Sequence, residues 1–145
     1  CSNFLGETID MAVEMGYQGI LFVSHIGKFI KAAGGIMNTH SRCADSRMEI
    51  LTANALRAGA PIDVLKDVLK AVTTDEGLTI LKQHGYLETT MKHIMEKIEF
   101  YLNNRAYQNL ELATLVFSNE LGELGRFGDV ESLLRKTNAW REETI

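Results

Sequence analysis

The feature that most constrains the fold is a short apolar run between two helical patterns. Residues 19–23 read Gly-Ile-Leu-Phe-Val, without any alternation of polar and apolar side chains. A strand that is buried on both faces has this composition, and such strands are typical of parallel sheets covered by helices. A second run of strand composition covers residues 110–117. We therefore predict a helix-rich α/β fold with a largely parallel sheet flanked by helices.

Apolar residues recur every three or four positions through most of the remaining chain, which indicates amphipathic helices. Helices are expected over residues 7–15, in a short segment that ends at residue 33, and from just after residue 41 to about 58. Further helices are expected to begin at residue 61, to run from 73 to about 83, over 86–103, and from 129 to about 136. Two core stripes are predicted: Ile62, Leu65, Leu69 and Val72, and in the longest helix Leu87, Met91, Ile94, Ile98 and Leu102. Thr73 and Glu76 have capping-box spacing. A loop is expected through Gly122, Gly125 and Gly128.

Composition and charge narrow the class of protein. The 145 residues are 46% hydrophobic and 23% charged, which suits one globular domain. The net charge of −4 and the scattered cations argue against a nucleic-acid surface, and no apolar run approaches the roughly 20 residues of a membrane helix. Only two cysteines occur, so we expect a cytoplasmic protein.

The chain begins at Cys1, and its first residues resemble the end of a structural element. We therefore expect an upstream region to be missing, and residues 1–145 to form a single α/β domain of a longer chain. Residues 137–145 are expected to be a loose polar tail. A homodimer is compatible with the sequence, which does not fix the oligomeric state.

Polar pairs follow three expected strand ends, and each pair precedes a glycine: Ser2-Asn3, Ser24-His25 and Ser118-Asn119. The carboxyl ends of parallel strands share one edge of a sheet, where ligands bind. We predict that Asn3, Ser24, His25, Ser118 and Asn119 form a rim there, with the loop 38–41 leaning over it. The alternative is that Ser and Asn only end strands and cap helices. That alternative is preferred for the serines and stays open for the other three.

Residues 34–49 hold a dense group of polar and charged side chains. We expect a loop over 38–41 and then a helix that carries Arg42, Asp45, Arg47 and Glu49 in its first turns. Helix N-termini and guanidinium groups suit anionic ligands, and a carboxylate can orient His40. A solvated helix face with ion pairs would explain any two of the four charges.

Metal ligation has weaker support. Suitable ligand types occur at Cys1, His25, His40, Cys43 and Asp45, but the sequence has no C-x-x-C and no H-E-x-x-H motif. Cys43 is expected to be a small core residue. We therefore predict no metal site, and a Cys/His metalloenzyme is the third-ranked hypothesis.

Several linked motifs together resemble one known family. They are residues 1–6 with Ile9-Asp10, residues 25–28 (His-Ile-Gly-Lys), and residues 35–41 (Gly-Ile-Met-Asn-Thr-His-Ser) with Ala44-Asp45 and residues 47–49. In this order they resemble CbiD, the cobalt-precorrin-5B C1-methyltransferase family of anaerobic cobalamin biosynthesis. The resemblance covers about the first sixty residues, the helical layout of 61–104 and the strand at 110–117.

The resemblance implies S-adenosylmethionine as methyl donor, a cobalt-precorrin tetrapyrrole as substrate, and cobalt only as part of that substrate. It also implies a missing upstream domain, so that residues 1–145 would be the carboxyl-terminal domain of a longer two-domain enzyme. Side-chain chemistry then suggests the roles. A proton would be handled by His25, His40 and Asp45. The substrate would be bound by Asn3, Lys28, Asn38, Thr39, Ser41, Arg42, Arg47 and Glu49. The donor would be bound by Gly6, Gly27, Ser118 and Asn119. The alternative is a non-catalytic α/β module that binds anions or corrinoids.

Overall fold

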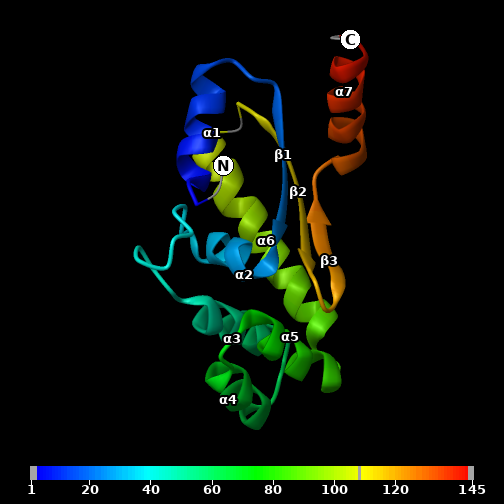
Figure 1. Cartoon of the computed structure of the whole chain (residues 1–145). Coiled ribbons are helices and arrows are strands. Elements are labelled where there is room, and N and C mark those ends of the chain that lie inside the picture. The colour runs from blue at the N-terminus through cyan, green and yellow to red at the C-terminus, as the bar shows by residue number, and fades with distance from the viewer. Residues whose placement is uncertain (1–2, 108, 144–145) are drawn as a thin grey trace.

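A small mixed sheet forms the centre of the molecule. The computed structural model describes residues 3–107 and 109–143. Strands β1 (Gly19–His25) and β2 (Glu111–Ser118) pair in parallel, with His25 opposite Phe117. Strand β3 (Gly122–Phe127) pairs antiparallel with β2, which gives the order β1-β2-β3 (Figure 1). The two strands predicted from sequence are confirmed, and so is the helix-rich α/β class.

The expected largely parallel sheet is wrong, because the glycine-bearing stretch after β2 is a strand and not a loop. Gly122 opens β3 with a φ of +75°, a conformation that glycine adopts without strain. A Cβ added at Gly125 would lie 2.6 Å from Met95 Cγ. The glycines therefore serve a tight turn into β3 and a close approach of β3 to α6, and only tertiary contacts reveal the second role.

Helices cover both faces of the sheet. In chain order they are α1 (Leu5–Glu14), α2 (Ile26–Phe29), the 3₁₀ helix η1 (Ile30–Gly34), α3 (Arg47–Arg57), α4 (Ile62–Lys70), α5 (Thr74–Gln83), α6 (Leu87–Ala106) and α7 (Val130–Glu143). The long helix α6 runs from the lobe of α3, α4 and α5 along the sheet towards α1 (Figure 1). On β2, Leu112 and Val116 belong to the main core, whereas Ala113 packs with Val130 and Leu133 of α7.

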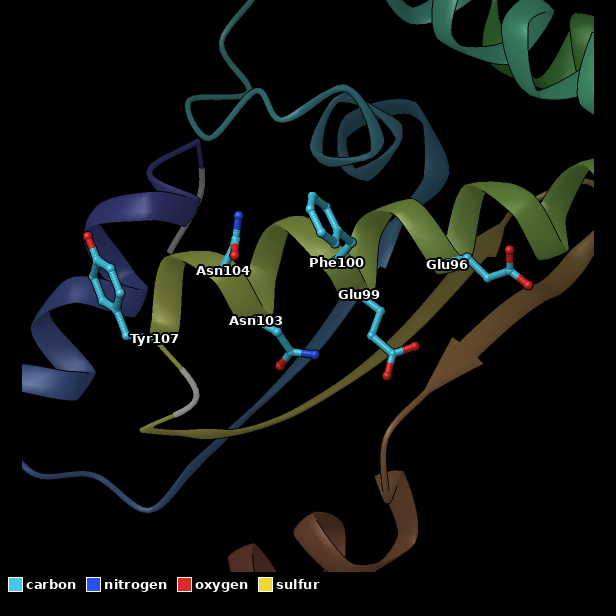
Figure 2. A pocket seen from close by; sticks show the side chains of 6 residues that line it. All are labelled: Glu96, Glu99, Phe100, Asn103, Asn104 and Tyr107. Carbon is cyan, nitrogen blue, oxygen red and sulfur yellow. The ribbon is translucent and has the colours of Figure 1, made fainter.

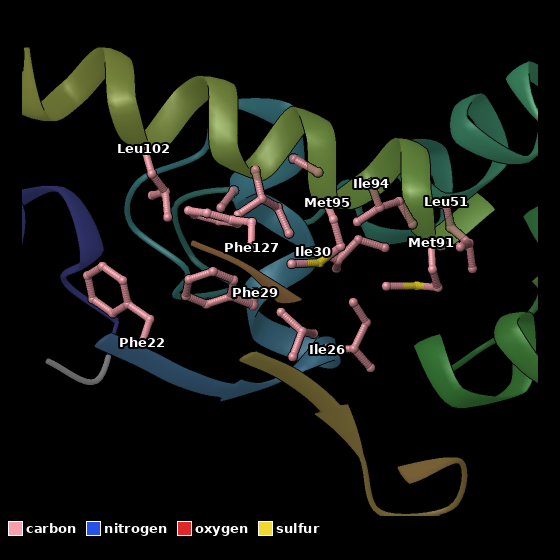
Figure 3. Close-up of a cluster of buried hydrophobic side chains, with 14 of the residues drawn as sticks. Phe22, Ile26, Phe29, Ile30, Leu51, Met91, Ile94, Met95, Leu102 and Phe127 are labelled. Carbon is pink, nitrogen blue, oxygen red and sulfur yellow. The ribbon is translucent and has the colours of Figure 1, made fainter. Parts of the chain in front are cut away.

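The main core lies between α6 and the sheet. The predicted α6 stripe is confirmed at Met91, Ile94, Ile98 and Leu102, which are at most 2% exposed, while Leu87 is partly buried. Figure 3 shows Met91, Ile94 and Leu102 of α6 in one cluster with side chains from the sheet, α2 and η1: Phe22, Ile26, Phe29, Ile30 and Phe127. Each buried side chain of this size contributes about 1.5–3 kcal/mol, so this contact fixes where the end of β1 sits.

The expected α4 stripe is wrong at three of its four positions. Ile62 and Val72 are 71% and 80% exposed, and Leu69 is also exposed, whereas Val64, Leu65 and Val68 are buried. Both sets have helical spacing. The contacts of α4 with α3 and α5 decide which one is inside, and sequence periodicity does not contain that information.

Helix ends agree with the sequence where a side-chain cap defines them. Thr73 Oγ1 accepts the Glu76 N–H at 3.1 Å, and Glu76 Oε2 accepts the Val72 N–H at 2.9 Å, so the capping interaction predicted at the start of α5 is confirmed. Asp129 accepts the Ser132 N–H at the start of α7. Helix α7 continues to Glu143, so residues 137–143 of the expected tail are helical.

Candidate functional site

The carboxyl ends of β1 and β2 meet at one edge of the sheet, as predicted. His25, the last residue of β1, is the N-cap of α2, and its Nδ1 accepts the Gly27 N–H at 2.9 Å. The Nδ1 lone pair is therefore in use. In neutral His25 the proton accordingly lies on Nε2.

Asp75, in the first turn of α5, is hydrogen-bonded to the end of β2 and lies near the end of β1. The hydroxyl of Ser118, the last residue of β2, donates to Asp75 Oδ1 at 2.6 Å. The other carboxylate oxygen, Oδ2, lies 3.6 Å from His25 Nε2. Ser118 is only 2% exposed, and its oxygen also accepts the N–H groups of Glu120 and Leu121. The Asp75 carboxylate is thus held between the ends of two strands.

A pocket of about 390 Å³ opens beside His25 and Asp75. Its lining comes from the end of β1, from α2, and from the first turns of α3 and α5: His25, Gly27, Lys28, Arg47, Thr73, Thr74 and Asp75. We call it the strand-end pocket. It combines two cations with one carboxylate. The buried Oγ1 of Thr74 has no hydrogen-bond partner in the described part of the chain.

Arg47 is positioned by an ion pair. Its Nε and Nη2 donate to the two oxygens of Asp45 at 2.9 and 3.3 Å. These hydrogen bonds hold the pKa of the Asp45 carboxyl below its ordinary value and raise the pKa of Arg47. Asp45 therefore stays ionised and serves mainly to orient the guanidinium at the pocket.

Residues 38–46, which we call the charged turn, are not helical where a helix was expected from just after residue 41. The helix begins at Arg47 and not just after Ser41, so Arg42 and Asp45 precede it. Local side-chain bonds explain the delay: Asn38 Oδ1 accepts the His40 N–H, and His40 Nδ1 accepts the Arg42 N–H. Such bonds compete with helix formation. Ser46 occupies the N-cap position but makes no side-chain cap.

Thr39 ties this turn to the start of α1. Its N–H and its hydroxyl donate to the carbonyl and side-chain oxygens of Asn3 at 2.9 and 3.3 Å. Its own carbonyl accepts a 3.0 Å bond from Lys31 Nζ, and Lys31 is only 3% exposed. Asn3 thus contacts the charged turn. Cys1 and Ser2, which precede it, lie outside the described residues.

A second cavity, of about 270 Å³, also has Lys28 in its lining. Its lining is mixed polar and apolar: Leu5, Phe22, Val23, Ser24, Lys28, Phe29 and Thr39. Because Lys28 lines both spaces, the structure brings Ser24, His25, Gly27, Lys28, Thr39 and Arg47 of the sequence prediction into one region. Ser118 reaches it through Asp75.

Other predicted site residues do not line either space. Ser41, Arg42, Glu49 and Asn119 are exposed, and Asn38 and His40 bond within their own turn. Gly6 has a packing role, because a Cβ there would lie 2.9 Å from Met37 Cβ. Cys43 is exposed and not a core residue. In residues 3–107 and 109–143, no three His, Cys, Asp or Glu side chains lie close enough to hold a metal ion.

The sequence interpretation missed Thr73, Thr74 and Asp75 as pocket residues. The capping interaction of Thr73 and Glu76 was a usable signal, since it located the first turn of α5. Nothing in the sequence shows that this turn lies against the end of β1, 50 residues earlier in the chain. The contacts of α2 with α5 provide that information.

A larger space of about 770 Å³ lies along α6, lined by Glu96, Glu99, Phe100, Asn103, Asn104 and Tyr107. Figure 2 shows that these side chains come from one helix and its end, with Phe100 and Asn104 on one side and Glu99 on the other. Two carboxylates and no cation line it, so it is unsuited to an anionic ligand. None of the predicted site residues is among them.

No helix in the described ranges has the length and apolarity needed to cross a membrane.

Residues 38–128 match the family described as "CbiD, C-terminal domain". This stretch contains the charged turn, Asp75 and Ser118, but it begins after His25 and Lys28.

Curated relatives match nearly the whole chain. The protein named cobalt-precorrin-5B C(1)-methyltransferase from Ruminiclostridium cellulolyticum is 44% identical over 124 residues, which cover 86% of this chain and 32% of the relative. Proteins of the same name from Alkaliphilus metalliredigens and Clostridioides difficile are 37% and 36% identical, each over 92% of this chain. The chain spans about a third of the length of these relatives. No solved structure matches it.

Proposed function

Because the chain belongs to the CbiD family, we propose that it is the carboxyl-terminal portion of a longer enzyme that methylates C1 of cobalt-precorrin-5B. The observation that carries this proposal is the identity of 36–44% to proteins of that name over most of the chain. The methyl donor is S-adenosylmethionine, whose sulfonium supplies an electrophilic methyl group. The cobalt belongs to the substrate.

The strand-end pocket supports a role in binding the reactants. Methyl transfer between two bound molecules depends mainly on holding the reacting atoms close and in line. Lys28 and Arg47 line the pocket and can bind carboxylates, Arg47 with a planar fork of donors that Asp45 orients. We therefore keep Lys28 and Arg47 as ligand-binding residues. The other substrate-binding and donor-binding assignments stay predictions.

His25 is the best placed of the three residues predicted to handle a proton, because it lines the pocket. Its Nδ1 already accepts the Gly27 N–H, so neutral His25 acts through Nε2–H as a donor and not as a base. Asp45 is engaged by Arg47, and the Nδ1 of His40 is engaged by its own turn. The catalytic roles of His40 and Asp45 therefore stay predictions with less support.

A non-catalytic corrinoid-binding module is the second candidate. The observation that favours it is length, since 145 residues correspond to about a third of the relatives. On this view the isolated chain binds a corrinoid through the strand-end pocket and does not turn over, and the remaining two thirds complete the reaction site.

We also place the enzyme in the cytoplasm, which the small number of cysteines supports. The homodimer stays a prediction.

The proposal is tested with the full-length enzyme, cobalt-precorrin-5B and S-adenosylmethionine under anaerobic conditions. We expect one equivalent of S-adenosylhomocysteine for each corrinoid consumed, and a new methyl group at C1 by nuclear magnetic resonance. Methylation at another ring carbon, or none, contradicts the proposal. The 145-residue chain alone is the control: corrinoid binding without S-adenosylhomocysteine release identifies it as the binding portion.

A further inference from the structure

The strand-end pocket carries charges of both signs, which a site for carboxylates alone would not need. Lys28 and Arg47 are cationic, whereas Asp75 is a carboxylate in the same lining. A carboxylate repels the acidic side chains of a corrinoid and so would weaken a site meant only for them. Opposite charges in one small pocket are complementary to a ligand that is itself a zwitterion.

Asp75 is fixed in place and still has acceptor capacity. Its side chain is 20% exposed, and the Ser118 hydroxyl takes one position on Oδ1. His25 Nε2, at 3.6 Å, is beyond a good hydrogen bond. A carboxylate has about four acceptor positions, so Asp75 can still receive the N–H groups of an ammonium ion.

The other side of the pocket has free donors. Lys28 is exposed and makes no ion pair among the described residues. The first N–H groups of a helix lack partners within it, and in α5 only that of Glu76 is taken by the Thr73 hydroxyl. The buried Thr74 hydroxyl also has no partner among the residues that the structure describes. A ligand carboxylate beside Lys28 and this helix start would satisfy these groups.

The volume agrees with a small ligand. About 390 Å³ is near the lower end of the roughly 300–1,000 Å³ typical of small-molecule sites. We propose that the strand-end pocket binds the amino-acid end of S-adenosylmethionine, with its α-ammonium on Asp75 and its α-carboxylate between Lys28 and the start of α5. This inference rests on the proposed function and assigns the donor, and not the corrinoid, to this pocket.

The test is calorimetric binding to the full-length enzyme, with two probes that differ in the amino-acid end. S-adenosylhomocysteine has it, and 5′-methylthioadenosine lacks it. Asp75→Asn and Lys28→Ala should each weaken S-adenosylhomocysteine about ten- to a hundredfold, because each removes a charge-assisted hydrogen bond, and should leave 5′-methylthioadenosine within about twofold. Asp75→Glu, which keeps the charge, should recover part of the affinity.

Asp67→Asn and Lys66→Ala on α4 are matched controls, since both residues are exposed and away from the pocket. Equal weakening of both probes, or none in either variant, overturns the inference, as does weakened binding of the corrinoid alone. Lys28→Ala involves an exposed side chain, so it tests the pocket even if Asp75→Asn unfolds. C1 methylation by the wild type upholds the proposed function whichever result the variants give. A wild type that binds no S-adenosylhomocysteine overturns the inference, and it overturns the proposed function only if C1 also stays unmethylated.

Discussion

Ser118 and Asp75 are 43 positions apart, yet the Ser118 hydroxyl donates to Asp75 Oδ1 at 2.6 Å. This bond joins the end of β2 to the first turn of α5 and sets the Asp75 carboxylate at the strand-end pocket. Because Ser118 is buried and also receives two backbone N–H groups, one side chain supports both the β2–β3 turn and the pocket.

Ser118→Ala should therefore lower the free energy of unfolding by about 1.5–3 kcal/mol, the usual contribution of a hydrogen bond to a charged group. The thermal midpoint should fall by several degrees, at about 2–4 °C per kcal/mol for a chain of this size. Asn119→Ala, at an exposed neighbouring position, is the control and should change stability by less than about 0.5 kcal/mol. Equal unfolding midpoints for the two variants would contradict this account of Ser118.

Gly128 and Gly16 offer a matched pair of glycines with the same backbone conformation. Their φ angles are +73° and +72°, but a Cβ at Gly128 would lie 2.3 Å from the Leu112 carbonyl oxygen, whereas Gly16 has open space. Gly16→Ala should cost about 1–2 kcal/mol from the left-handed conformation alone. Gly128→Ala should cost clearly more in urea unfolding, because backbone atoms must move apart. Similar costs would show that the hairpin end adapts freely.

Asp10 and Arg105 form an ion pair at 2.6 and 2.8 Å between α1 and α6. Hydrogen bonds from Arg105 lower the pKa of Asp10. Since the folded pKa is below the unfolded value of about 3.9, the pair stabilises the fold above that pH, and the effect is lost as pH falls through the lower folded pKa.

Both side chains are about 40% exposed, 39% for Arg105 and 43% for Asp10, so the contribution is at most about 1 kcal/mol. Asp10→Asn should be slightly less stable than wild type at pH 7, and the difference between their urea midpoints should shrink as pH falls below about 3.9. A difference that grows on acidification would contradict the sign.

His25 caps α2 through Nδ1, and this structural role can be tested separately from hydrogen-bond donation by its Nε2–H. His25→Ala should lose about 0.5–2 kcal/mol of stability, and His25→Asn should recover most of it, because Asn is a strong N-cap residue. If the Nε2–H donates to a reactant, His25→Asn will restore stability in thermal unfolding without restoring the methylation rate of the full-length enzyme. Recovery of both would leave His25 a cap only.

The sequence predicted the parts of the fold that local patterns determine. Apolar sequence patterns predicted the two buried strands and the α6 stripe, and a short-range hydrogen bond explains the Thr73 capping interaction. The α4 stripe failed because two sets of residues both have helical spacing, Ile62, Leu65 and Leu69 on the one hand and the buried Val64, Leu65 and Val68 on the other. Only the packing against α3 and α5 separates the two sets. Strand β3 was missed because its glycines indicate a loop until Met95 is known to lie against Gly125.

The site was predictable in part for the same reason. His25 and Ser118 were expected at the strand ends because parallel strands end at one edge of a sheet, and Lys28 was expected from the His25–Lys28 stretch that follows. Arg47 was expected on a helix that starts earlier, and it reaches the pocket because Asp45 and the bonds within the turn delay that start. Asp75 was not predicted, since its place depends on how α5 packs beside α2.

The most direct test of the central claim is the rate at which the full-length enzyme transfers an isotope-labelled methyl group from S-adenosylmethionine to C1 of cobalt-precorrin-5B. It compares the wild type with Lys28→Ala, and with Lys66→Ala as control. We predict label at C1 for all three proteins, with a rate at subsaturating donor about ten- to a hundredfold lower for Lys28→Ala only. Unlabelled C1 in the wild type, or equal rates for all three proteins, would contradict the account.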